Sequence, residues 1–125
     1  MYIFYNPNPS GLFTDDCTVR AICKALDRDW NDVYLDLCLE GSILHRMPSA
    51  SVVWNSYLTK RGFKRFIVPN TCPICYTIKD FAKEHSEGIF IVATDDHVVT
   101  IINGDYYDTG DSGDEIPVYY WKETK

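Results

Sequence analysis

The sequence predicts an α+β fold, in which N-terminal helices pack against a C-terminal antiparallel sheet. In the first half, apolar residues recur at helical spacing, and in the second half short runs of β-branched and aromatic residues alternate with turn residues. Helices followed by strands is the order typical of α+β proteins. The chain has 125 residues and shows no repeat or linker. We therefore expect a single domain spanning residues 1–125, large enough to bury a core without disulfides or metal sites.

Composition and charge exclude several classes of partner. The net charge of −6 argues against binding to phosphate backbones. The basic cluster "KRGFKRF" at 60–66 is the exception. Lys60 and Arg61, however, also end a predicted helix, where the helix dipole stabilises cations. The start "MYIFYNPNPSG" lacks the basic and apolar regions of a signal peptide, and no segment is apolar enough to span a membrane. We therefore expect a cytoplasmic protein with no nucleic-acid or membrane partner, whose cysteines are unpaired.

The first predicted helix follows the loop "GLFTDD". Its apolar face is formed by Val19, Ile22, Cys23 and Leu26. Asp15 or Asp16 is a suitable N-cap, which places Cys17 in the first helical turn. Cys23 falls on the apolar face and Cys38 near another one, so both are expected to be structural.

Two further helices complete the first half. The second begins at Asp29 and turns Trp30, Val33 and Leu37 inward. Residues 40–42 ("EGS") and Pro48 bracket the connection to the third helix, predicted over 49–61. Gly62 occupies the C′ position of that helix, where glycine is common.

The second half begins with a short strand at 63–69, ended by a proline. A short helix follows at 77–85, with Thr77 and Asp80 in the positions of a capping box. Four strand-like runs come next, at 89–94, 97–102, 105–109 and 116–121. Because short turn sequences separate these runs, they predict an antiparallel meander.

Cys17 has the position of a reactive thiol. The free N–H groups and the positive dipole end of a first helical turn stabilise the thiolate, which is the nucleophilic form of cysteine. Such a nucleophile also needs a histidine, and the histidine needs an orienting acid or amide. His45 lies in a connection and His85 at a helix end, whereas His97 heads a central strand. His97 is therefore the candidate base.

The next hairpin supplies a candidate for the third group. Asn103-Gly104 favours a two-residue type I′ turn. This register places Asp108 diagonally beside His97 on the same face of the sheet. A three-residue loop would reverse the faces and offer Asp111 instead. The "NG" turn favours Asp108.

The order of cysteine on a helix, then histidine and aspartate on a sheet, resembles the papain-like cysteine peptidase superfamily. The likeness is to its small form, shared by bacteriocin-leader peptidases and cell-wall hydrolases. More closely, "NPSGLFTDDCTVRAI", "HVVTIINGDYYDTGDS" and the final "VYYW" are similar to a family of small phage and bacterial proteins. The resemblance runs from Asn8 to Trp121.

The resemblance implies a role for each matching residue. Cys17 would be the nucleophile, His97 the general base and Asp108 its orienting partner. Asn8 stands where papain-like enzymes place an oxyanion-hole amide, although Asn6 competes for that role, and the backbone N–H of Cys17 would be the second donor. The implied activity is that of a cysteine hydrolase, which cleaves a peptide or amide bond in a peptide or protein substrate. The reaction passes through a thioester and needs no metal or cofactor. Deamidation or transfer would use the same groups.

The chain departs from the family pattern at two places. Asp15 stands where glycine is expected before "DC", and Gly110 stands where an aromatic residue is expected after "DT". The acidic side chains of Asp15 and Asp16 are expected to raise the pKa of Cys17, which His97 must overcome. The alternative function is a catalytically inactive papain-like scaffold that binds a host or phage protein.

The motif "CPIC" at Cys72–Cys75 suggests two other chemistries. A structural zinc site needs four ligands, and no second closely spaced pair exists in the sequence. Thioredoxin-like chemistry needs the motif to open a helix in a βαβ unit, whereas here the helix starts later, at Thr77. The expected arrangement is a loop with two incidental cysteines.

Overall fold

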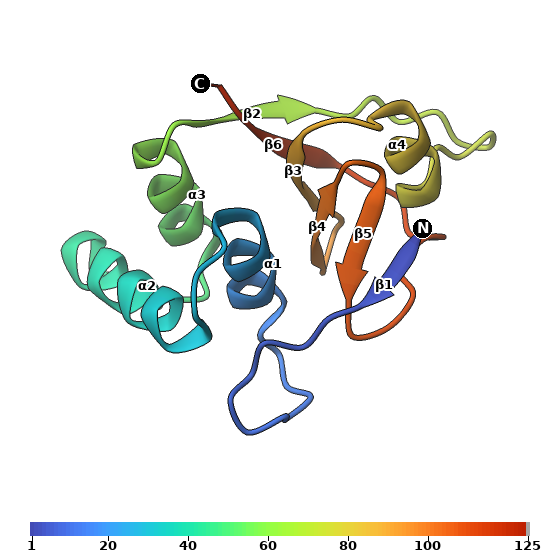
Figure 1. The fold of residues 1–125 in the computed structure, drawn as a ribbon. Coiled ribbons are helices and arrows are strands. Elements are labelled where there is room, and N and C mark those ends of the chain that lie inside the picture. Colours follow the sequence, from blue (N-terminus) through green and yellow to red (C-terminus); the bar gives the residue numbers. More distant parts are fainter. Residues whose placement is uncertain (125) are drawn as a thin grey trace.

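A computed structural model describes residues 1–124 as a six-stranded sheet with helices on both of its faces (Figure 1). The helices are α1 (Cys17–Leu26), α2 (Trp30–Leu44), α3 (Ser51–Lys60) and α4 (Ile78–Glu84). The strands are β1 (Tyr2–Phe4), β2 (Phe63–Ile67), β3 (Ile89–Ala93), β4 (Val98–Ile102), β5 (Asp105–Asp108) and β6 (Tyr119–Glu123). Helices lie mostly in the N-terminal half and strands in the C-terminal half, so the predicted α+β class is confirmed.

The strand order is β1-β5-β4-β3-β6-β2. Strands β3, β4 and β5 form the predicted antiparallel meander, but the prediction that β6 continues it is wrong. β6 pairs with β3 on the opposite side, and β1, which sequence patterns did not indicate, pairs in parallel with β5. Because β1 occupies the free edge of β5, the last strand must pair elsewhere, and the sheet is mixed rather than wholly antiparallel.

The hairpin between β4 and β5 has the predicted turn. Asn103 and Gly104 have φ angles of 50° and 84°, the left-handed values that a type I′ turn needs at both central residues. Ile102 pairs with Asp105 directly across the turn. This register fixes which residues of β5 share a face with the start of β4.

Helix α2 extends further than predicted, through the "EGS" segment to Leu44. Gly41 is tolerated there because the helix packs closely against the next connection. A Cβ atom at Gly41 would lie 2.6 Å from the carbonyl oxygen of Arg46. His45, with a left-handed φ of 59°, ends the helix.

The sheet is buried on both faces by two apolar clusters. On β3, Ile91 and Ala93 belong to the cluster beneath α1, α2 and α3, whereas Phe90 and Val92 belong to the cluster beneath α4. This alternation follows the two-residue period of a strand. The central strands are therefore held from both sides, which makes β4 a rigid support for side chains at its ends.

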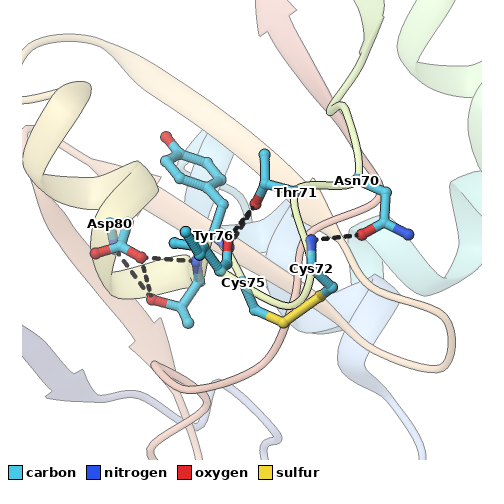
Figure 2. Close-up of a disulfide and its surroundings, with 8 residues drawn as sticks. Asn70, Thr71, Cys72, Cys75, Tyr76 and Asp80 are labelled. Carbon is cyan, nitrogen blue, oxygen red and sulfur yellow. Dashed lines mark hydrogen bonds between the residues drawn. A yellow bond between two sulfur atoms is a disulfide. The ribbon is translucent and has the colours of Figure 1, made fainter.

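The "CPIC" loop between β2 and α4 contains a disulfide between Cys72 and Cys75 (Figure 2). The prediction of two incidental, unpaired cysteines is therefore wrong. In this state the two sulfur atoms are bonded to each other and neither is a thiolate ligand for zinc. The side chain of Thr71 accepts a hydrogen bond from the Tyr76 N–H at 3.0 Å within the same loop.

Helix α4 begins directly after this loop with the predicted capping box. The Thr77 hydroxyl accepts from the Asp80 N–H, and the Asp80 carboxylate accepts from the Thr77 N–H. Within residues 1–124, none of the helices has both the length and the apolar character required to cross a membrane.

One buried hydrogen bond joins α1 to β4. The Thr100 hydroxyl, fully buried, donates to the backbone carbonyl of Ala21 at 2.5 Å. The bond sets the position of the helix that carries Cys17 relative to the strand that His97 precedes.

Replacing Thr100 with valine keeps the side-chain shape but removes this donor. We expect Thr100→Val to lower the free energy of unfolding by about 1 kcal/mol, the net contribution of a typical hydrogen bond. Urea unfolding measures the change, and Thr59→Val is the matched control because the Thr59 hydroxyl makes a similar bond on an exposed helix surface. Equal losses in both variants would contradict the role assigned to Thr100.

Candidate active site

Three elements bring the predicted site residues to one end of the sheet. Cys17 is the first residue of α1, His97 immediately precedes β4, and Asp108 is the last residue of β5. Figure 1 shows the start of α1 and the end of β5 at the same end of the molecule, below the central strands. Cys17 is 80 or more positions from His97 and Asp108 in the chain. It meets them because α1 packs on β4, and the antiparallel pairing of β4 with β5 brings His97 and Asp108 together.

Asp108 is the hydrogen-bonding partner of His97. The His97 Nε2 atom lies 2.5 Å from Asp108 Oδ2, and the carboxylate is only 2% exposed. The Ser112 hydroxyl also donates to Oδ2, at 2.8 Å, and the Thr109 N–H donates to Oδ1. These bonds hold the carboxylate in one orientation and fix the plane of the imidazole.

Asp111, the alternative third residue, has a different role. Its Oδ1 atom accepts hydrogen bonds from the Tyr106 hydroxyl at 2.7 Å and from the Gly113 N–H at 2.9 Å. Asp111 therefore stabilises the connection after β5. Between the two aspartates, the contact with His97 belongs to Asp108.

The contact with Asp108 determines how His97 can act on Cys17. Because Nε2 is bonded to the carboxylate, Nδ1 is the ring nitrogen left for the thiol. The hydrogen bond to Asp108, followed by the one to Cys17, raises the pKa of His97 to about 10. The imidazolium form is thus favoured at neutral pH.

The Cys17 thiol is half-buried, and opposing effects act on its pKa. Burial raises the pKa, but the hydrogen bond and positive charge of His97 lower it, as do the Val98 N–H and the charge of Arg20. The net shift is downward, which favours a thiolate beside an imidazolium. His97 therefore lowers this pKa as expected, and neither Asp15 nor Asp16 is among the main causes of the shift.

Arg20 explains why Asp16 does not destabilise the thiolate. Its Nη1 atom lies 2.5 Å from Asp16 Oδ1 and its Nη2 atom 2.9 Å from Asp108 Oδ1. All three side chains are buried. Arg20 thus neutralises the N-cap carboxylate and ties the first turn of α1 to the residue that orients His97.

Arg20 was not among the predicted site residues, although the sequence contained a signal for it. Asp16 and Arg20 are four residues apart, the spacing of an ion pair along one helix. That spacing gave no indication of burial or of the second partner, Asp108, because the second contact depends on where β5 ends.

Asp16 is the N-cap of α1, as predicted, but its side chain does not cap the helix. Its Oδ2 atom instead accepts a hydrogen bond from Trp30 Nε1 at 2.9 Å. The first N–H groups of an α-helix have no partner within the helix. The Cys17 N–H is one of these, so it is a suitable oxyanion donor.

Asn8, the predicted oxyanion-hole side chain, lies in the loop before α1. Its Oδ1 atom accepts from the Ser10 N–H at 2.9 Å, and its own backbone N–H donates to Asn6 Oδ1. Within residues 1–124, no hydrogen bond joins Asn8 or Asn6 to the three residues of the site. The oxyanion role of Asn8 stays a prediction.

Comparisons of the chain with models of protein families, with curated proteins and with solved structures gave no match. The resemblance to papain-like enzymes thus stays an interpretation of the sequence. Within residues 1–124, no group of three or more histidine, cysteine or acidic side chains is arranged to hold a metal ion.

The position of Arg20 between two buried carboxylates predicts a large effect of its removal. Arg20→Met should lower the free energy of unfolding by roughly 3–5 kcal/mol, because two buried negative charges lose their counter-ion. Urea unfolding of this variant and of Arg46→Met, an exposed control, measures the difference. Similar small losses in both variants would show that Arg20 is not the counter-ion of the site.

The raised pKa of His97 also predicts how stability depends on pH. The protonated ring stabilises the folded state fully below its ordinary pKa of about 6.5, and this contribution is lost as the pH rises towards about 10. In a Cys17→Ala background, the stability lost on changing His97 to glutamine should therefore be largest at pH 6 and shrink by pH 10. A difference that is constant across this range would contradict the ion pair with Asp108.

Proposed function

We propose that this protein is a papain-like cysteine hydrolase that cleaves a peptide or amide bond in a peptide or protein substrate. The proposal rests on the contacts of His97. Its Nε2 atom is bonded to Asp108, which leaves its other ring nitrogen for Cys17. The papain-like order of Cys17, His97 and Asp108 along the sequence supports the same proposal.

The first step is attack of the Cys17 thiolate on the substrate carbonyl. The C–S bond forms as the carbonyl electron pair moves to oxygen, and the Cys17 N–H donates to that oxyanion. Asn8 is proposed as the second donor. The imidazolium of His97 then gives its proton to the leaving amine as the C–N bond breaks, which leaves a thioester on Cys17.

The second step is hydrolysis of the thioester. Neutral His97 takes a proton from water, the hydroxide oxygen attacks the thioester carbonyl, and the C–S bond breaks to release the acid and restore the thiolate. Asp108 keeps the ring oriented and stabilises its positive charge in both steps. An amine in place of water would give transfer, and a side-chain amide in place of the main chain would give deamidation.

The pH dependence of alkylation tests whether the pair exists. We expect iodoacetamide to react with Cys17 with an apparent pKa well below the roughly 8.5 of a free thiol. His97→Ala should remove this shift, and Asp108→Asn should reduce it. Mass spectrometry resolves each cysteine, and Cys38 on α2 serves as the reference within the same molecule.

An apparent pKa of Cys17 that is the same in the wild type and in His97→Ala would overturn the proposal. The fold would then be a scaffold without a nucleophile, and binding of a host or phage protein would be the remaining function of the two considered.

A further inference from the structure

A cavity lies beside the first turn of α1. Asp16 and Thr18, which flank Cys17 in the chain, help to line it, whereas Cys17, His97 and Asp108 do not. Its volume is about 360 Å³, at the lower end of the roughly 300–1,000 Å³ typical of ligand pockets. It is formed by the segment that leads into α1, the first turns of α2 and the α2–α3 connection. A cavity of this size and position suits one side chain of a bound peptide.

Aromatic rings form one wall of the cavity. Trp30 and Tyr34 are stacked, with ring centroids 5.1 Å apart and planes 8° from parallel. The hydrogen bond from Trp30 Nε1 to Asp16 holds the indole in place. The faces of such rings attract cations, most strongly for tryptophan.

A free carboxylate stands at the rim of the same cavity. Asp15 lines it and is exposed to solvent. Among residues 1–124, no salt bridge involves Asp15, whereas the neighbouring Asp16 is neutralised by Arg20. The lining contains no lysine or arginine. Unlike the buried carboxylates, Asp15 is therefore available to an incoming positive charge.

We infer that this cavity is a specificity pocket for a lysine or arginine side chain of the substrate. The inference deepens the proposed function and rests on it, since Cys17 is the group that would act beside the pocket. The charged end of the basic side chain lies over the aromatic wall formed by Trp30 and Tyr34, where it also pairs with Asp15. The Asp16 carboxylate bonds both Trp30 and Arg20, so the pocket wall and the charged network of the site share one residue.

Binding of a matched pair of small ligands tests the pocket without requiring any reaction. The probes are Nα-acetyl-arginine amide and Nα-acetyl-citrulline amide, which have nearly the same shape but differ in charge. The readout is the NMR signal of the Trp30 indole N–H during titration. We expect the arginine probe to shift this signal with a dissociation constant roughly 3- to 30-fold lower than that of the citrulline probe, the range given by one cation–π contact and one exposed ion pair.

Variants locate the source of this preference. Asp15→Asn should reduce the preference for arginine, whereas Glu87→Gln, which changes the net charge equally but precedes β3 away from the cavity, should leave it intact. Equal binding of the two probes, no binding of either, or the same result in both variants would overturn the inference. None of these outcomes depends on the reactivity of Cys17, which tests the proposed function separately.

Discussion

The arrangement of the site depends on one buried carboxylate, Asp108. It accepts hydrogen bonds from His97, Arg20 and Ser112 while only 2% of its surface is exposed. A buried carboxylate without partners would take up a proton or destabilise the fold. The two positive groups remove that penalty, and each of them reaches the first turn of α1. Asp108 therefore both orients the candidate base and holds the helix that carries Cys17.

The same network joins the candidate catalytic residues to the inferred pocket. Arg20 donates hydrogen bonds to both Asp108 and Asp16, and Asp16 accepts another from the indole of Trp30. A bound cationic side chain would thus rest on a wall fixed by the residues that set the charge around Cys17. With protonated His97 included, two positive groups, Arg20 and His97, balance the carboxylates of Asp16 and Asp108, so a thiolate is tolerated at a helix start rich in acids.

The sequence predicted those parts of the fold and site that depend on local pattern. The Asn103-Gly104 turn fixed the register of the hairpin, and this register distinguished Asp108 from Asp111. Arg20 and the placement of β6 were missed, because both depend on which distant segments meet. The placement of β6 follows from the parallel pairing of β1 with β5, and no short-range pattern in the sequence indicates that pairing. The Cys72–Cys75 pairing was missed for a different reason, since spacing alone does not distinguish a disulfide from two free thiols.

Turnover at Cys17 with a reactive acyl donor tests most directly whether Cys17, His97 and Asp108 form a catalytic site. Intact-mass spectrometry of the protein mixed with p-nitrophenyl acetate follows the acetyl group while released nitrophenol is counted. We expect acetylation confined to Cys17 and lost again with time, with many equivalents of nitrophenol released. Cys17→Ala and His97→Ala should show no such turnover. An acetyl group that stays on Cys17 after a single equivalent, or that spreads equally over the lysines, would contradict this expectation.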